Sequence, residues 1–342
     1  MKVIGIETSC DETSVALLDF DENQQLPKIL HQEVSSQIKI HQPYGGVVPE
    51  LATRQHLIHL RPMIHKVLER AQTKWHHIDL IGVTRGPGLA SSLMIGLSFA
   101  KACAIASEIP WLGINHLEGH LVSAFLSHNS VPIYPHLGLI ISGGHTQIIH
   151  VKALSDYELI GSTRDDAAGE AFDKVAKMLD LPYPGGPVVE ELARNGDASS
   201  ISFPRAMINK PNYSFSFSGL KTAVKLYLDE NPHWTHDKQH LSNICASFQQ
   251  AVIDVLIHKT FKAAQELNLT TVSLSGGVSC NQAIRQTFAE EASRKGIKCV
   301  LAAPYLSTDN ASMIALVAAL QHQQGVLQKW DTDIDPNLKL AS

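Results

Sequence analysis

Two histidines stand four residues apart in the segment Asn115-His116-Leu117-Glu118-Gly119-His120. On a helix, side chains at this spacing share one face, with Cβ atoms about 5–6 Å apart. Two imidazoles placed in this way can bind one divalent metal ion. Because the chain has 18 histidines, two unrelated surface histidines explain the spacing equally well. A metal site needs at least one more ligand, and Asp309, in a strand-to-helix turn, is a reasonable donor.

The histidine segment differs from the His-Glu-x-x-His motif of zinc proteases. Glu118 follows His116 by only two residues, so it points to another face of the helix. This argues against peptide hydrolysis by the mechanism of those enzymes.

Three turns rich in glycine and hydroxyl groups form a second group of candidates. In Leu137–Val151, two apolar runs flank Ser142-Gly143-Gly144-His145-Thr146, which predicts a hairpin whose amides and hydroxyls suit a phosphate. The segment Lys2–Leu18 repeats the pattern of strand, polar turn and strand. In Val272–Asn281, a glycine turn lies between a strand and a helix, where a nucleoside can lie against the backbone. Each turn taken alone is equally well a plain structural turn.

The two hairpins predict a duplicated architecture. Proteins of the actin/Hsp70/sugar-kinase (ASKHA) type have two α/β lobes, each RNase H-like with a central mixed sheet flanked by helices, and two hairpins hold a nucleotide between the lobes. We therefore expect an N-terminal lobe over residues 1–134 and a C-terminal lobe over 135–342, with the nucleotide and metal site in the cleft. The apolar helix over 311–325 is expected to pack back on the first lobe. Kinases share this fold, so the fold does not settle the chemistry.

Four further features concern the elements around these motifs. A helix is predicted from Glu50, kinked or divided at Pro62. Its polar face, which includes Arg54 and His56, is either solvated or faces RNA. Asp165 or Asp166 is expected to cap a helix that continues to Leu179. Asp173 in that helix, and Glu190 beside Gly185-Gly186, either bind ribose hydroxyls or only cap and solvate their helices.

Composition limits the class of protein. The 342 residues carry a net charge of −5 and 44% hydrophobic residues, so the chain is expected to fold but not to bind nucleic acid unaided. Five widely spaced cysteines without a Cys-x-x-Cys motif indicate a reducing compartment. The apolar run Leu89–Ala106 contains Lys101 and several serines, which favours a buried helix over a membrane span. With too short an apolar run at the N-terminus for a signal peptide, the cytoplasm is the expected location.

Ten motifs, in order along nearly the whole chain, resemble those of the TsaD-type tRNA adenosine threonylcarbamoyltransferase family, formerly labelled O-sialoglycoprotein endopeptidase. Two positions depart from the common pattern: Leu117 stands where methionine is usual, and Cys280 replaces a usually small residue. The motifs are GIETSCDETSVA (5–16), YGGVVPE (44–50), GPGLASSL (86–93), NHLEGH (115–120), SGGHT (142–146), DDAAGEAFDK (165–174), YPGGP (183–187), FSFSGLKTA (215–223), GGVSCN (276–281) and STDN (307–310).

The resemblance implies an acyltransferase. It would move the threonylcarbamoyl group of threonylcarbamoyl-AMP to N6 of adenosine 37 in tRNAs that read codons beginning with A. It implies that one divalent iron or zinc ion is held by His116, His120 and Asp309. The residues implied to bind the adenylate are Ile140, Ile141, Ser142, Gly143, Gly144, Asp173, Gly186, Glu190 and Asn281. The implied partners are tRNA, a paralogous TsaB-type subunit and a small TsaE-type ATPase.

Asp11 and Glu12, on the first hairpin, are candidates for assisting proton removal from the adenine amine. Other functions remain open at the level of sequence. An ATP-dependent kinase or ATPase of the same fold leaves the histidine pair without a role. A secreted metalloprotease conflicts with the position of Glu118, and a non-catalytic scaffold leaves the three glycine turns unexplained.

Overall fold

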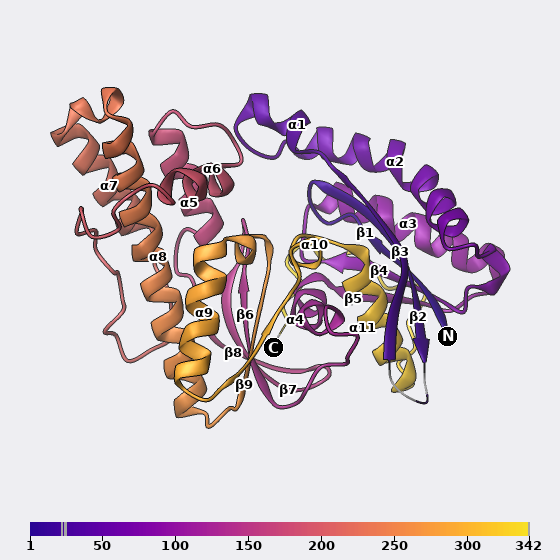
Figure 1. Ribbon diagram of the computed structural model, residues 1–342. Helices are drawn as coiled ribbons and strands as arrows, with labels where there is room; N and C mark the ends of the chain where they lie inside the picture. The colour runs from indigo at the N-terminus through magenta and orange to yellow at the C-terminus, as the bar shows by residue number, and fades with distance from the viewer. Residues whose placement is uncertain (22, 24–25, 341–342) are drawn as a thin grey trace. The chain divides into compact units, whose positions relative to one another are not determined.

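The computed structural model describes residues 1–21, 23 and 26–340 and divides into two compact units (Figure 1). Unit 1 comprises residues 1–133, 154–156 and the segment from 302 onward, and unit 2 comprises residues 134–153 and 157–301. Residues 302–342 were expected in the second lobe, with the helix over 311–325 packing back on the first. The segment from 302 onward belongs to unit 1, because the helix over 311–323 buries its apolar side chains against the sheet of that unit.

The sheet of unit 1 has five strands in the order β3-β2-β1-β4-β5. The predicted first hairpin is confirmed: β1 and β2 pair antiparallel, with Gly5 opposite Ala16. The pairs β1–β4 and β4–β5 are parallel, which makes the sheet mixed. The strand bounds are β1 (Lys2–Glu7), β2 (Glu12–Asp21), β3 (Leu26–Ser36), β4 (Leu80–Gly86) and β5 (Trp111–Asn115).

Helices cover both faces of this sheet, and the alternation of side chains along β1 assigns them. Ile4 and Ile6 pack into a cluster with α2 (Pro49–Arg70) and α3 (Ala90–Ser107). Val3 packs into another cluster with α4 (His116–Leu126) and α11 (Ala311–Gln323). Figure 1 shows α2 and α3 along the same side of the strands. Shorter elements complete the unit: α1 (Ile38–His41), η1 (Gln42–Tyr44), η2 (Trp75–His77) and α10 (Pro304–Ser307).

The structure corrects two expectations about α2. The helix is not divided at Pro62 but continues from Pro49 to Arg70, while a kink at Pro62 stays a prediction. His56 does not belong to the exposed polar face, because its side chain is fully buried. It faces the first hairpin, where both ring nitrogens have hydrogen-bond partners.

Helix α3 is long and apolar enough to cross a membrane, with a mean hydropathy of 1.4. One third of the helix is buried, and Leu93, Leu97 and Ala100 lie on that buried face. Leu97 and Ala100 pack in the same cluster as Ile4 and Ile6 of the sheet. Burial of this one stripe against a sheet is typical of a helix on a domain core.

Unit 2 repeats the strand order of unit 1. Its sheet runs β10-β9-β6-β7-β8, so β6 to β10 take the places of β1 to β5. The pair β6–β7 is antiparallel, which confirms the predicted central hairpin, and β6–β9 and β9–β10 are parallel. The bounds are β6 (His136–Ile141), β7 (Thr146–Ala153), β8 (Asp156–Ser162), β9 (Thr271–Ser275) and β10 (Lys298–Leu301).

One core cluster joins the second sheet to its helices, among them α8, whose Phe248 meets Phe172 of α5 edge to face at 5.1 Å. The predicted cap of α5 was wrong, because Ala167 is its N-terminal flanking residue. The Asp165 carboxylate instead accepts the amides of Phe217 and Ser218, where α7 begins. The helices are α5 (Ala168–Met178), α6 (Gly185–Ala193), α7 (Ser218–Glu230), α8 (Lys238–Glu266) and α9 (Gln282–Arg294), with η3 (Pro232–His236) and η4 (Gly277–Cys280).

Candidate functional site

Three side chains of unit 1 bring their ligand atoms together. The Nε2 atoms of His116 and His120 lie 3.4 Å and 3.1 Å from the same oxygen of Asp309, Oδ1. All three ligand atoms lie within 4.8 Å of one another. Ligand atoms around a tetrahedral zinc ion, with bonds of about 2.0–2.1 Å, lie roughly 3.3 Å apart. The donor set and its spacing therefore fit one divalent metal ion.

Local structure explains how the two imidazoles reach this position. Asn115 ends β5, and its side chain accepts the Leu117 amide, which starts α4 directly at His116. The two rings then lie on one face of the helix, edge to face with centroids 4.7 Å apart. Both side chains are buried, whereas Asp309 is partly exposed. Glu118 lies on another face and accepts a hydrogen bond from Gln321 of α11.

A fully buried carboxylate, Glu7, lies on the other side of His116. Its Oε2 is 3.0 Å from His116 Nδ1. Burial alone lowers the pKa of His116, but the charges of Asp309 and Glu7 and the Glu7 hydrogen bond outweigh it and raise the pKa to about 9. Burial opposes ionisation of Glu7, yet the charge and hydrogen bond of His116 hold its pKa below the usual value. Both shifts favour the ionised pair, and a metal ion bound at Nε2 would have to displace a proton from that atom.

The candidate proton acceptors Asp11 and Glu12 lie in the β1–β2 turn and at the start of β2. Burial, followed by the charges of Asp309 and Asp11, raises the pKa of Glu12 well above its usual value. A carboxylate whose pKa is raised is a stronger base, once ionised, than one with the usual pKa. Because the charge of Asp309 acts on Glu12, the candidate base lies within electrostatic range of the three candidate metal ligands.

The imidazole of His56 in α2 contacts the residues that flank Asp11 and Glu12 in the sequence. Its Nε2 lies 2.9 Å from the carbonyl oxygen of Cys10, and its Nδ1 lies 2.7 Å from Thr13 Oγ1. Since a carbonyl only accepts, Nε2 carries the proton and Nδ1 accepts from the hydroxyl. Burial lowers the pKa of His56, which favours this neutral form.

In unit 2, the predicted adenylate-binding residues lie on segments linked by a closed circuit of contacts. The β6–β7 turn contacts α5, because Gly169 donates its amide to the Ser142 carbonyl at 3.2 Å. Helix α5 contacts α6 through Asp173, which accepts the Gly185 amide at 2.7 Å. Helix α6 contacts the start of α9, where Glu190 accepts the Gln282 amide at 3.0 Å. The circuit closes where Gly276 packs against the carbonyl oxygen of Ile141.

Three glycines on these segments border open space. A Cβ added at Gly143, Gly144 or Gly186 would meet no atom within 4 Å. Asn281 caps α9 by accepting the Ile284 amide, and its amide group donates to Gln249 Oε1 at 2.7 Å. Exposed amides at a hairpin tip suit an anionic group such as a phosphate.

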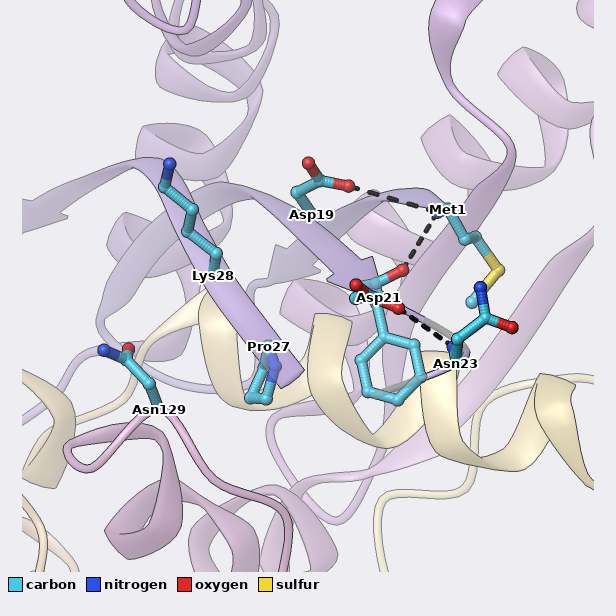
Figure 2. Close-up of a pocket in the computed structure, with 8 residues that line it drawn as sticks. Met1, Asp19, Asp21, Asn23, Pro27, Lys28 and Asn129 are labelled. Atoms are coloured by element: carbon cyan, nitrogen blue, oxygen red, sulfur yellow. Dashed lines mark hydrogen bonds and ion pairs between the residues drawn. The ribbon is translucent and has the colours of Figure 1, made fainter. Parts of the chain in front are cut away.

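A surface pocket of about 790 Å³ lies elsewhere in unit 1 (Figure 2). It borders the end of β2 opposite to Glu12, where the N-terminal amine lies 4.0 Å from Asp19. None of the predicted site residues lines it. Its lining residues are Met1, Asp19, Phe20, Asp21, Asn23, Pro27, Lys28 and Asn129.

Three neighbours of the candidate site were not identified from the sequence: Glu7, Thr84 and Gln249. Thr84 Oγ1 donates to Glu7 at 2.6 Å, and Gln249 accepts from Asn281. Glu7 did offer a signal, because it is a carboxylate that ends an otherwise apolar strand. Thr84 and Gln249 offered none, since both are ordinary residues within a strand and a helix.

Comparison with known proteins identifies the family. The family model of TsaD, tRNA N6-adenosine threonylcarbamoyltransferase, matches residues 28–316. This chain belongs to the TsaD family. Relatives named tRNA N6-adenosine threonylcarbamoyltransferase match over nearly full length. The protein of Anaeromyxobacter sp. (strain Fw109-5) is 45% identical over 99% of this chain and 100% of its own length. That of Desulfotalea psychrophila is 47% identical over 92% and 91% of the two chains.

Solved structures support the same fold for this TsaD-family chain. Full-length HypF, in a phosphate- and nucleotide-bound form, matches with a TM-score of 0.60 at 14% identity, covering 94% of this chain and 55% of its own. Component A of (R)-2-hydroxyglutaryl-CoA dehydratase from Acidaminococcus fermentans matches with a TM-score of 0.52 at 16% identity, over 94% and 98% of the two chains. The predicted ASKHA-type fold, with two mixed sheets flanked by helices, is confirmed. The family does not favour the kinase alternative.

Proposed function

We propose that this protein transfers the threonylcarbamoyl group from threonylcarbamoyl-AMP to N6 of adenosine 37 in tRNAs that read codons beginning with A. Membership of the TsaD family supports the reaction. The observation that carries the assignment of residues is the convergence of His116, His120 and Asp309. A kinase or ATPase of the same fold has no use for these three ligands.

The two parts of the substrate differ in chemistry, and each matches one set of residues. The adenylate suits unit 2, where the Ser142-Gly143-Gly144 turn supplies amides for the phosphate. The other residues proposed to bind the adenylate lie on the segments that these contacts join: Asp173, Gly186, Glu190 and Asn281. The threonylcarbamoyl group offers oxygen atoms, which suit a divalent metal ion held by the ligands of unit 1.

Transfer forms one bond and breaks another. The N6 nitrogen of adenosine attacks the carbamoyl carbon, and the bond from that carbon to the phosphate oxygen breaks, so that AMP leaves. His116, His120 and Asp309 would hold an iron or zinc ion, which would supply Lewis-acid activation of the carbonyl oxygen. The amides of the unit 2 turn stabilise negative charge on the departing phosphate. Asp11 or Glu12 accepts the proton from N6, and the raised pKa of Glu12 suits it to this task.

The proposal extends to partners and location. With a net charge of −5, the chain is expected to bind tRNA weakly by itself. We propose that it acts with a paralogous TsaB-type subunit and a small TsaE-type ATPase, in the cytoplasm. Full-rate transfer by the isolated chain would contradict this part of the proposal.

The first experiment is a transfer assay with synthetic threonylcarbamoyl-AMP, unmodified tRNA and the purified partners. The wild type is compared with a His116→Ala/His120→Ala variant, and the metal content of both is measured. We expect product from the wild type only, with metal lost from the variant. The matched control is His128→Ala, a histidine just beyond the end of α4 and outside the donor set, which should retain metal and transfer.

Two results would contradict parts of the proposal. Transfer that survives loss of the metal would make the histidines structural. ATP turnover without transfer by the wild type would favour the kinase alternative.

A further inference from the structure

We infer that Glu7 is a positioning residue that holds the His116 ring with Nε2 directed at Asp309 and thereby sets the metal affinity of the site. This inference rests on the metal site of the proposed function. Glu7 is not one of the three ligands, because its carboxylate lies on the opposite side of the His116 ring.

The Glu7 carboxylate is itself fixed by three donors from three segments. Its Oε1 accepts the Ser9 amide at 2.5 Å. Its Oε2 accepts the Thr84 hydroxyl at 2.6 Å and faces His116 Nδ1 at 3.0 Å. The donors come from the β1–β2 turn, from β4 and from α4. A fully buried carboxylate held in this way has little freedom to move.

This arrangement determines the tautomer of His116. The Glu7 carboxylate only accepts, so Nδ1 must carry a proton. In the neutral ring the lone pair is then on Nε2, which is the atom that lies 3.4 Å from Asp309. The negative charge of Glu7 also increases the basicity of the ring, as carboxylates behind metal-bound histidines do.

The second histidine lacks this support. Among the described residues, no hydrogen-bond partner reaches His120 Nδ1, although the atom is buried. The two imidazoles therefore differ: both face Asp309 through Nε2, but among the described residues only His116 is also held at Nδ1, by Glu7. Metal affinity should respond to changes at Glu7 more than to changes at other buried carboxylates of the unit.

The test is the affinity for Zn²⁺, measured on the full chain by competition with a chromophoric chelator, together with the Co²⁺ absorption spectrum. Glu7→Gln keeps the shape of the side chain but cannot accept both the Ser9 amide and the Nδ1 proton with two oxygens. We expect Zn²⁺ affinity to fall about 10–100-fold, the range typical of such supporting residues. The Co²⁺ d–d bands should also shift, because His116 changes orientation.

Two controls separate positioning from general damage. Glu118→Gln alters another buried carboxylate, on the same helix, that accepts from Gln321, and it should leave Zn²⁺ affinity and the Co²⁺ spectrum unchanged. Thr84→Val removes one neutral donor to Glu7 and should cost less than about threefold in affinity. If Glu7→Gln does not fold in the metal-free state, Glu7→Asp, which keeps the charge but withdraws it by one methylene, should show the same loss.

Wild-type Zn²⁺ affinity in Glu7→Gln, or an equal loss in Glu118→Gln, would overturn the inference. If His120→Ala also binds Zn²⁺ like the wild type, Zn²⁺ binds elsewhere, and the metal site falls together with this inference. Failure of the transfer assay with Zn²⁺ binding intact would instead refute the proposed reaction and leave the role of Glu7 standing.

Discussion

The two units have the same sheet but different chemistry at the corresponding turns. In each, the first two strands form an antiparallel hairpin, and the fourth and fifth strands run parallel to the first. In unit 1 the hairpin turn between Glu7 and Glu12 is acidic and contacts His116 and His56. In unit 2 the turn between Ile141 and Thr146 has the same length but exposes two glycines.

A second correspondence lies after the fourth strand of each sheet. Gly88 follows β4, and a Cβ there would lie 2.6 Å from the carbonyl oxygen of Ser9. Gly276 follows β9, and a Cβ there would lie 2.4 Å from the carbonyl oxygen of Ile141. Gly88 lets its turn pack onto the hairpin turn after β1, and Gly276 lets its turn pack onto the end of β6.

The comparison shows that the duplicated fold fixes where functional groups stand, whereas the side chains at those positions decide what they bind. Unit 1 places histidines and carboxylates near its hairpin turn, which suits a metal ion. Unit 2 places amides at the same location, which suits an anion.

The largest expected effect is a separation of two binding activities. Asp309→Asn should lower Zn²⁺ affinity by more than about 100-fold, beyond the loss expected for a supporting residue, and leave adenylate binding unchanged. Asp173→Asn should weaken binding of threonylcarbamoyl-AMP by about tenfold, since a hydrogen bond to an ionised acceptor is lost, and leave Zn²⁺ affinity unchanged. Calorimetric titration of each variant with each ligand tests this, and crossed effects would show that the two sets of residues are not distinct.

The next effect compares two glycines within unit 2. Gly276 has φ +90° and no room for a Cβ, so Gly276→Ala should lower the free energy of unfolding by about 2–4 kcal/mol. Gly143→Ala meets open space and should change it by less than about 0.5 kcal/mol. Chemical denaturation of both variants measures the difference, and equal stability would mean that the close approach at Gly276 is not needed.

A smaller effect concerns the support of Asn281. Gln249→Leu leaves the buried Asn281 amide without its acceptor and should cost about 1–3 kcal/mol of stability. It should also raise KM for threonylcarbamoyl-AMP more than it lowers kcat, because the adenylate site is affected and the metal ligands are not. A change in kcat alone would argue that Asn281 acts in the transfer step.

The smallest effect is a difference between the units in the pH at which stability falls. The folded pKa of His56 is lowered, so its contribution is present above the unfolded value of 6.5 and decreases as the pH falls below it. In unit 2, burial opposes ionisation of Asp165 and Asp166, but hydrogen bonds outweigh it and lower both pKa values, from Ser216 among others to Asp165 and from Lys174 among others to Asp166. Their contributions to stability therefore disappear only as the pH falls below 3.8.

Denaturation between pH 7 and pH 3 tests this difference. In His56→Gln the decrease in stability near pH 6 should be smaller than in the wild type, whereas Asp165→Asn should alter only the acid limb. If stability near pH 6 decreases as much in His56→Gln as in the wild type, the role given to His56 is refuted.

Much of the site followed from local sequence, because local patterns determine local structure. Alternating apolar residues around the Ser-Gly-Gly turn predicted β6 and β7, and the spacing of His116 and His120 placed both on one face of α4. The glycine turn before Asn281 was correctly placed between a strand and a helix. In each case the decisive interactions join residues only a few positions apart.

The remaining features depended on contacts between residues distant in the chain. Asp309 meets His120 across 189 positions, because α11 packs on the first sheet and brings the preceding turn to α4. Glu7 meets His116 across 109 positions, and Asp165 serves α7 instead of the helix that follows it. His56, one of many polar residues on α2, became buried because the first hairpin covers it. Sequence alone determined the turns and the ligand types, and tertiary packing decided which carboxylates meet which imidazoles.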